Sequence, residues 1–251
     1  METIRVIDRA LDVIELLSDS QNPMTLTELS NASGLSKSTL HRLLSVLTER
    51  QYIEKRADGT YTIGYKMIEA VSNHINGLEL LTEAKPFLTE VSRELGLNTH
   101  LGILDEGQVV YIEKSDNQSD IQKYTSVGCH SPAYCSSIGK CLMACLSGDE
   151  LDELLYRVKF VQYTQNTITD QKEFRRMLRV IRKQGWAMDN EEYQKGHRCV
   201  GAPIFDYRGT AIAAFSVSAS DYMLRDEDLE KVIGKVKKTA AEISRRMGYV
   251  E

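Results

Sequence analysis

The sequence predicts an α+β protein of two domains: a small one made of helices and a hairpin, and a larger one in which helices bracket an antiparallel sheet. Three observations predict this. The 251 residues exceed the usual size of a single domain. Apolar residues recur at helical spacing up to Leu47 and then at alternate positions over residues 52–63. The same change of period, from helix to strand, occurs again after Gly96.

The first element is a helix from Ile4 to about Leu17, because apolar residues recur there every three or four positions. We expect its apolar residues to close the core of the small domain: Val6, Ala10, Leu11, Val13, Ile14 and Leu17. Its polar side is acidic, with Asp8, Asp12 and Glu15.

The stretch from Thr25 to Leu47 predicts two helices joined by a tight turn. Thr25 and Glu28 have the spacing of a capping box at the start of the first helix. Gly34 ends that helix and Ser36 caps the second. The second helix turns one apolar side to the core, through Leu40, Leu43, Leu44 and Leu47.

The other side of the second helix is polar. It carries Lys37, Ser38, Thr39, His41, Arg42 and Ser45. These residue types donate hydrogen bonds to phosphates and base edges, and the first turns of the second helix enter the major groove in helix-turn-helix proteins. Between Lys37 and Arg56 there are five cations against two anions, so positive charge is confined to the region that phosphate contact would need. An ordinary helical hairpin with a solvated polar face is the alternative.

Residues 52–63 argue against that alternative, because they predict a β-hairpin. Tyr52 to Lys55 and Tyr61 to Ile63 alternate around the turn sequence of residues 57–59. Helix, helix-turn-helix and hairpin in this order make a winged helix, so we assign residues 1–64 to a DNA-binding domain. Its predicted DNA contacts also include the two helix caps and the hairpin cations: Thr25, Ser36, Lys55 and Arg56.

Residues 65–81 predict a linker helix, because apolar residues recur there at helical spacing. The next helix is predicted from Phe87 to Leu95, with Pro86 at its start and Gly96 as its C-terminal cap. The second domain is therefore expected to span residues 82–251.

The second domain mixes strands and helices. Strands are predicted at Thr99–Leu104, Val109–Glu113, Ile121–Val127, Trp186–Asn190, Val200–Asp206 and Ala211–Ser218. Helices are predicted from about Ser137 to Leu146 and over Leu151–Arg157, Gln171–Gln184 and Asp226–Met247. This pattern is typical of an α+β sensor-like domain.

A set of short motifs follows one another along the chain: IDRALDVIELL, GLSKSTLHRLLSVL, GTYTIGYKMIE, THLGILDEGQVVYIEK, PAYCSSIGKCLMACL, NTITD, DNEEYQKGHRCVGAPIFD and AAFSVSAS. In this order they resemble the IclR family of transcriptional regulators over essentially the full chain. IEK, NTITD, DNEE and the closing RRMGY are most similar to regulators of 2-keto-3-deoxygluconate and related sugar-acid catabolism. The resemblance implies a GAF-like effector-binding domain whose pocket holds a small metabolite, often a 2-oxo or hydroxy acid.

The resemblance also implies the residues that line this pocket: Ser137, Ile138, Asp189, Cys199, Ser216 and Ser218. Their chemistry fits a small anion. Unpaired backbone N–H groups at the start of a helix near Ser137 favour a carboxylate, and Ser216 and Ser218 share one face of a strand. Family sequences commonly have glycine and alanine where Ser137 and Ile138 stand, so the larger side chains here reshape the pocket.

These residues also have purely structural explanations. Ser137 is equally well placed to cap its helix, and Asp189 could pair with Arg198 or another cation. Cys199, apart from the resemblance, is the kind of small residue that strands bury. Ser216 and Ser218 carry more weight, because two hydroxyls on a buried face need partners.

Charge and composition narrow the partners. A net charge of −5 excludes a nonspecific coat for nucleic acid and favours a specific, dimeric reader. We expect a homodimer, or a dimer of dimers, on a pseudo-palindromic DNA operator, with a small carboxylate as effector. No apolar run is long enough to span a bilayer and no signal peptide opens the chain, so a cytoplasmic protein without membrane contact is expected. Five cysteines without a regular framework fit reduced thiols in that compartment.

No metal or cofactor is predicted, because no Cys-x-x-Cys pair occurs and the cysteine spacings fit no ordinary zinc site. Cys141 and Cys145 share one helix face and are expected in the core. Cys129 and Cys135 are candidates for exposed or oxidation-sensing thiols.

An enzyme is not predicted either. Asp189, His197 and Cys199 are residue types of a nucleophilic set, but this spacing need not bring them together on a substrate. The chain has no nucleophile elbow, phosphate loop or dinucleotide fingerprint. An activator, a regulator with another small-acid or aromatic effector, and a protein-interaction adaptor remain as alternatives to a repressor.

Overall fold

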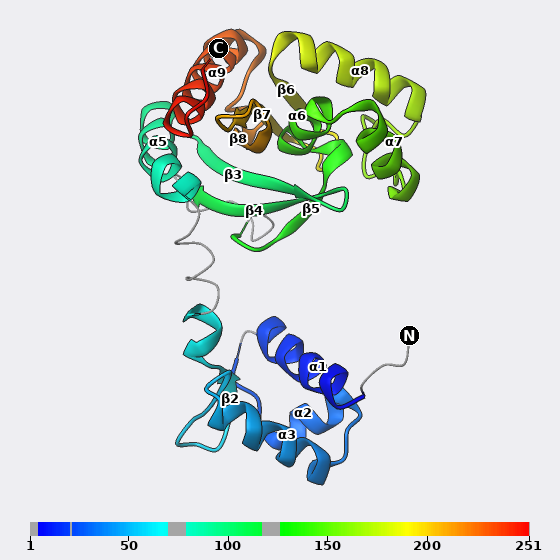
Figure 1. Cartoon of the computed structure of the whole chain (residues 1–251), viewed down its shortest axis with the longest axis vertical. Coiled ribbons are helices and arrows are strands. Elements are labelled where there is room, and N and C mark those ends of the chain that lie inside the picture. Colours follow the sequence, from blue (N-terminus) through cyan, green and yellow to red (C-terminus); the bar gives the residue numbers. More distant parts are fainter. Residues whose placement is uncertain (1–4, 21, 70–78, 117–125, 251) are drawn as a thin grey trace. The chain divides into compact units, whose positions relative to one another are not determined.

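The structure is a computed structural model, and it describes residues 5–20, 22–69, 79–116 and 126–250 (Figure 1). The chain divides into two compact units, Met1–Leu78 and Glu79–Glu251. Each unit has a hydrophobic core of its own. Within the described ranges, no helix is both long and apolar enough to cross a membrane.

The first unit is the predicted winged helix. Its elements are α1 (Arg5–Asp19), α2 (Leu26–Ser33), α3 (Lys37–Glu49), β1 (Ile53–Lys55) and β2 (Tyr61–Ile63). One cluster of buried residues joins them: Val13, Leu17, Leu29, Leu40, Leu44, Leu47, Ile53 and Tyr61. Because α3 gives three leucines to this core, its opposite side is left to solvent.

The predicted caps of the helix-turn-helix are confirmed. Thr25 Oγ1 accepts a hydrogen bond from Glu28 N at 3.2 Å, and Glu28 Oε2 accepts one from Thr25 N at 2.7 Å. Gly34 ends α2 with a φ of 67°, a left-handed conformation that glycine adopts at least cost. Ser36 Oγ accepts from Thr39 N and so begins α3.

The prediction that the whole apolar stripe of α1 enters the core is wrong in part. Val13 and Leu17 are buried, but Val6 is 63% and Leu11 is 51% exposed. Among the described residues α1 packs mainly against α2 and β2, and these short elements do not cover a stripe of that width. The outer side of α1 is therefore an exposed apolar surface.

The wing is a short antiparallel hairpin in which Ile53 lies opposite Ile63. Asp58 Oδ1 accepts hydrogen bonds from Thr60 N and Oγ1 and closes the turn. The segment before α2 also joins this sheet, because Met24 and Tyr61 exchange backbone hydrogen bonds of 2.9 and 2.8 Å. The wing is thus tied to the start of the helix-turn-helix.

The linker helix is only partly within the described residues. Residues 65–69 are helical, whereas the part of the prediction over residues 70–78 lies outside the described residues. The helix predicted from Phe87 begins earlier, since α5 spans Glu79–Leu95 with Pro86 in its interior. Buried apolar residues at helical spacing hold this earlier part of α5 in place: Leu80, Leu81, Ala84, Leu88 and Val91. They outweigh the hydrogen bond that the proline removes.

The second unit is built on a six-stranded antiparallel sheet in the order β5-β4-β3-β8-β7-β6. The strands are β3 (Asn98–Asp105), β4 (Gln108–Ser115), β5 (His130–Pro132), β6 (Ala187–Asn190), β7 (His197–Phe205) and β8 (Ala211–Ser220). The helices are α6 (Ser137–Cys145), α7 (Gly148–Arg157), α8 (Gln171–Gln184) and α9 (Leu229–Arg246), with 3-10 turns at Ala133–Cys135 and Asp226–Asp228. The predicted α+β, GAF-like class is confirmed.

The helices lie on both sides of this sheet. Figure 1 shows α5 and α9 on one side and α6, α7 and α8 on the other. Helix α6 packs on β3, β6, β7 and β8 and also on α8, so it is covered all round and every residue from Ser137 to Ala144 is buried. Its first turn therefore opens into the interior of the unit instead of into solvent.

One strand prediction needs correction, and another lies mostly outside the described residues. The candidate strand Ile121–Val127 lies outside the described residues up to residue 125, and Ser126 and Val127 are not in a strand. The strand that pairs with the end of the β3–β4 hairpin is β5, which is too short to show a period in the sequence. Strand β7 also begins at His197, before the predicted start, because pairing with β8 extends to Ser220.

Candidate nucleic-acid interface and ligand cavity

The outer side of α3 has the arrangement that the sequence predicts. Lys37, Ser38, His41, Arg42 and Ser45 are exposed. Thr39 is half-buried, as is Leu43, which was expected to face inward. Cations and small hydroxyls thus make up most of the exposed side of the helix that follows the tight turn, and Val46, at 52% exposed, is its apolar exception.

Two of the predicted DNA contacts have hydroxyls that act within the fold. Thr25 Oγ1 donates to Glu28 Oε2 at 2.8 Å, in addition to its capping bond. Ser36 Oγ donates to Thr39 Oγ1 at 3.0 Å and lies 3.1 Å from Ser38 Oγ. Both residues are exposed, but their side chains fix the starts of α2 and α3. A DNA contact by either one stays a prediction.

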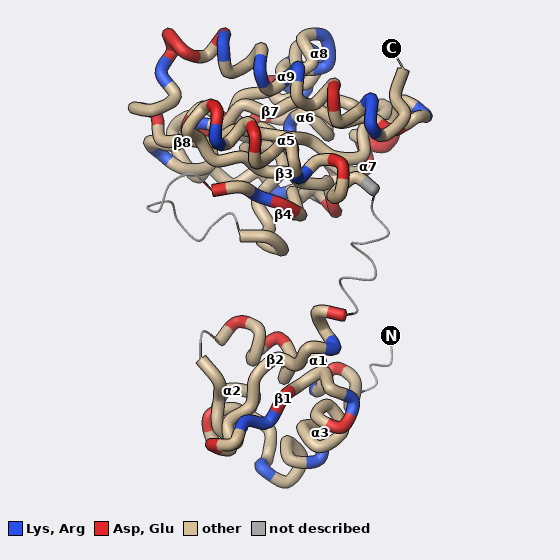
Figure 2. Tube along the Cα trace, turned by 90° about the vertical axis from the view of Figure 1, so that its left-hand side faces the viewer, with Lys and Arg blue, Asp and Glu red and all other residues tan. Residues whose placement is uncertain are grey.

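The wing adds two exposed cations, Lys55 and Arg56. Lys55 Nζ lies 5.7 Å from the centre of the Tyr61 ring. This contact holds the aliphatic part of the Lys55 side chain against the hairpin. Figure 2 shows this positive charge at the end of β1, whereas acidic residues lie on α1 and α2. The charge pattern fits contact with a phosphate backbone beside α3.

In the second unit, every residue predicted for the pocket lines one cavity of about 40 Å³: Ser137, Ile138, Asp189, Cys199, Ser216 and Ser218. Strand pairing explains the convergence. Asp189 lies opposite Cys199, and Cys199 lies opposite Ser218. The first turn of α6 covers this row, and it comes close because Gly201 has no side chain: a Cβ there would lie 3.2 Å from Ser137 Oγ.

The cavity also contains residues that sequence reasoning missed. They are His100, Tyr111, Ser131, Ser136, Tyr193, Gln194 and His197. His100 and Tyr111 lie on β3 and β4, and no local pattern reveals that β3 pairs with β8 and so brings this hairpin to the cavity. The motif DNEEYQKGH contains Tyr193, Gln194 and His197, so it was the one available signal for those three.

The alternative explanation of Ser137, that it caps its helix, is wrong. The cap is Ser136, whose Oγ accepts from Gly139 N at 3.0 Å, and Ser137 is the first helical residue. The first N–H groups of a helix have no partner within the helix, and the residues that carry them here, Ser137 and Ile138, line the cavity. A helix start of this kind, with the positive end of its dipole, favours a carboxylate.

The alternative pairing of Asp189 with Arg198 is wrong. Arg198 Nη2 pairs with Asp226 Oδ1 at 2.8 Å, and its Nε donates to Asn190 Oδ1. Asp189 Oδ1 instead accepts from Glu192 N at 2.8 Å. Burial raises the pKa of Asp189 to about 7, although the nearby Lys140 opposes this shift.

The five cysteines differ in how far they are buried. Burial raises the pKa of the Cys199 thiol well above its ordinary value, which keeps it protonated beside His197. Cys141 is buried as expected, whereas Cys145, also expected in the core, is only half-buried. Cys135 is buried, which contradicts its prediction as an exposed thiol. The residues that the structure describes hold no group of three or more His, Cys, Asp or Glu side chains suited to a metal ion.

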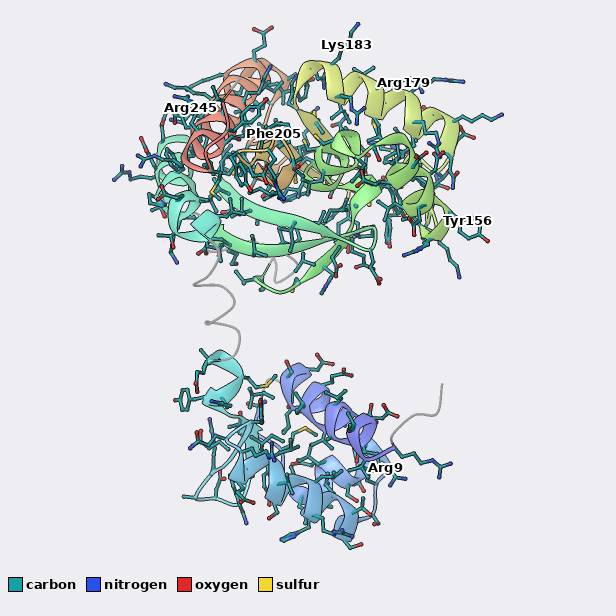
Figure 3. The ribbon with its side chains drawn as sticks, viewed as in Figure 1. Arg9, Tyr156, Arg179, Lys183, Phe205 and Arg245 are labelled. Carbon is teal, nitrogen blue, oxygen red and sulfur yellow. The ribbon has the colours of Figure 1, made fainter. Side chains whose placement is uncertain are left out.

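A second, open hollow of about 1290 Å³ lies between the C-terminal ends of α6, α8 and α9. Two of its cations are engaged within the chain: Arg182 Nε donates to the Ala144 carbonyl, and Lys237 Nζ to that of Gln184. Lys183 and Arg245 also line this hollow, and Arg179 of α8 points outward from the unit (Figure 3). We place the candidate ligand site in the smaller cavity because buried polar groups converge there.

Comparison with known proteins gives matches over the whole chain. Residues 6–57 match the family model "IclR helix-turn-helix domain", and residues 72–245 match "Bacterial transcriptional regulator IclR C-terminal". The chain is 34% identical to the HTH-type transcriptional regulator XynR of Escherichia coli over 250 residues, 99% of either chain. It is 30% identical to KdgR of the same organism over 249 residues, 99% of this chain and 94% of KdgR. The crystal structure of Thermotoga maritima IclR superposes with a TM-score of 0.88 at 30% identity, covering 98% of this chain and 100% of that one.

Proposed function

Because this chain belongs to the IclR family of bacterial transcriptional regulators, we propose that it represses a sugar-acid catabolic operon and is released from its operator by a small 2-oxo acid such as 2-keto-3-deoxygluconate. The chain is a regulator and not an enzyme. The observation that carries the effector proposal is the buried cavity at the start of α6. The 2-oxo acid follows from the resemblance of its effector domain to regulators of sugar-acid catabolism.

DNA recognition is assigned to α3 and the wing. The exposed side of α3 would enter the major groove, with Arg42 and Lys37 binding bases or phosphates and Lys55 and Arg56 binding the adjacent backbone. One such helix reads one half-site. Two half-sites on one face of the duplex would be spaced by about 34 Å or a multiple of it. Such a regulator acts where the chromosome lies, in the cytoplasm.

A homodimer, or a dimer of dimers, would place two of these helices on a pseudo-palindrome. The exposed apolar side of α1 supports a contact between two copies, because Val6, Ile7 and Leu11 are all more than half exposed. Burial of this side against the same side of a second copy would give an isologous interface. Such an interface has the two-fold symmetry of the operator.

The effector would enter at the start of α6. Its carboxylate would accept hydrogen bonds from the backbone N–H groups of Ser137 and Ile138, and its oxo group would face Ser216 and Ser218. A cavity of about 40 Å³ holds only about three water molecules. A six-carbon acid therefore requires the cavity to widen, and we propose that this widening is the conformational change that is coupled to the linker.

Coupling between the sites requires that the effector bind one arrangement of the dimer better than the other. A typical coupling free energy of about 1–3 kcal/mol would change operator affinity by roughly 5- to 150-fold. That range is enough for induction.

The test is a gel-shift titration on the promoter region of the neighbouring genes, with 2-keto-3-deoxygluconate, pyruvate or glyoxylate added. Release by one of these acids supports both assignments. Binding that none of them alters keeps the DNA assignment and contradicts the 2-oxo acid. Binding that an acid strengthens contradicts release by the effector. No binding at physiological salt would favour an adaptor.

A further inference from the structure

One ring nitrogen in the cavity is left without a partner. His100 lies on β3, opposite Ser216 of β8, and only 2% of it is exposed. Its Nδ1 lies 3.4 Å from Ser218 Oγ. Its Nε2 is buried and has no hydrogen-bond partner among the described residues. Buried polar groups of native proteins are almost always paired, so an unpaired one in a cavity needs an explanation.

The chemistry of the ring restricts that explanation. Burial lowers the pKa of His100 to about 4, so the imidazole is neutral near pH 7, with one N–H and one lone pair. Depending on the tautomer, Nε2 either donates or accepts one hydrogen bond. A hydroxyl group can do both, and it therefore suits Nε2 in either tautomer. A second carboxylate on the ligand can only accept a hydrogen bond, so it would suit only the tautomer that carries its proton on Nε2.

Among the described residues, the rest of the cavity wall supplies no cation, and Asp189 is its acidic side chain. The described residues that line it include no Lys or Arg. The buried cation of α6, Lys140, is already paired with Glu192. Next to His100, Tyr111 packs edge-on at 5.5 Å between ring centres, and its hydroxyl lies 3.2 Å from Ser131 Oγ. Only the start of α6 favours a negative charge, so the cavity has room for one charge and for uncharged polar groups.

We propose that His100 determines effector specificity, with its Nε2 bonded to a hydroxyl group of a hydroxylated monocarboxylate. This inference rests on the proposed function, since it takes the cavity as the effector site. The carboxylate lies at the start of α6 and the hydroxyl lies towards β3. Phosphorylated acids and dicarboxylates are excluded, because their second charge would be buried in this wall without a counter-ion.

The test uses pairs of acids that differ by one group. Calorimetric titration of the full chain compares pyruvate with 3-hydroxypyruvate, and glycerate with 3-phosphoglycerate. We expect the hydroxylated acid to bind about tenfold more tightly than pyruvate, the contribution of one good hydrogen bond, and 3-phosphoglycerate not to bind. In His100→Phe the ratio between the affinities for 3-hydroxypyruvate and for pyruvate should fall to about one. His100→Gln, which keeps a polar end, should retain part of it.

A second measurement covers the case in which His100→Phe does not fold. In the wild-type chain, the ¹⁵N resonance of His100 Nε2 should shift with 3-hydroxypyruvate and stay in place with pyruvate. A hydroxyl preference that survives in His100→Phe, or an unshifted Nε2, would overturn the role of His100 and leave the proposed function standing. If the wild type binds none of these acids and none of them alters operator binding, both the role of His100 and the proposed effector assignment are wrong.

Discussion

Lys140 Nζ lies 2.5 Å from Glu192 Oε1, and both side chains are buried, with 0% and 8% exposed. The pair joins α6, whose first turn lines the cavity, to the segment between β6 and β7 that carries Tyr193 and Gln194. Lys140 also donates to the Met188 carbonyl. Glu192 Oε2 has no partner within the part of the chain that the structure describes. The segment that carries Tyr193 and Gln194 is thus tied to α6 by a buried ion pair in which Lys140 supplies the positive charge.

Loss of Lys140 should therefore destabilise the second unit strongly. Lys140→Met leaves the Glu192 carboxylate buried without its counter-ion, and removal of one partner of a buried pair costs about 3–5 kcal/mol. Urea unfolding measures this loss. Lys140→Met combined with Glu192→Gln should recover much of it, and Lys172→Met, the same change at an exposed position of α8, should have almost no effect. Equal losses in the single and the double variant would contradict this account.

Arg42→Ala should weaken operator binding and leave effector binding unchanged. Arg42 is exposed on the polar side of α3, and loss of a base or phosphate contact from such a residue costs about 1–3 kcal/mol. Gel-shift titration gives the operator affinity, and calorimetry gives the effector affinity. Arg176→Ala on α8 is the matched control, since it removes an exposed arginine from the other unit. Operator binding like that of the parent chain would show that α3 is not the recognition helix.

Local signals were enough to predict the helix-turn-helix. The capping box of Thr25 and Glu28, the left-handed Gly34 and the cap at Ser36 all act within a few residues of the chain. The shared face of Ser216 and Ser218 was predictable for a similar reason, because side chains of a strand alternate.

The remainder of the cavity depends on contacts that are distant in sequence. Lys140 and Glu192 are 52 residues apart, and His100 and Ser218 are 118 apart, so no spacing rule connects them. The start of α5 shows the opposite failure. Pro86 is a good signal for a helix start, but the packing of Leu80 and Leu81 extends the helix before it. Local signals therefore determine whether a segment is a helix or a strand. Tertiary packing determines where that element begins and ends and which elements lie next to it.

Replacement of both Ser216 and Ser218 by alanine should abolish the effector response and preserve operator binding. Both hydroxyls are buried in the cavity, at 3% and 2% exposure, so their loss removes polar groups that a bound acid would need. Operator release by the effector, followed by gel shift, is the readout. Ser220→Ala is the control, because Ser220 lies on the same strand and does not line the cavity. A normal response in the double variant would place the effector elsewhere.

The raised pKa of Asp189 makes stability depend on pH. Burial raises this pKa from 3.8 to about 7, so between these values the folded chain keeps a proton that the unfolded chain releases. The free energy of unfolding should therefore fall as pH rises from about 4 to about 7 and show no further loss from this group above pH 7. Asp189→Asn should remove this component. Urea unfolding between pH 4 and pH 7 measures this dependence. If the free energy of unfolding falls with pH as steeply in Asp189→Asn as in the parent chain, the proton belongs to another group.

The same proton should govern effector affinity. An anion bound beside ionised Asp189 is repelled, so the protonated form is the one that binds, and the dissociation constant should rise by up to about tenfold per pH unit above pH 7. The other titratable groups around the cavity are expected to stay fixed in this range. Burial lowers the pKa of His100 and His197 and raises the pKa of Tyr111 and Cys199. Calorimetric titration between pH 6 and 8.5 measures the slope, with Asp189→Asn as the comparison. An affinity that is independent of pH in the parent chain, or one that falls equally in the variant, would show that Asp189 does not face the bound anion.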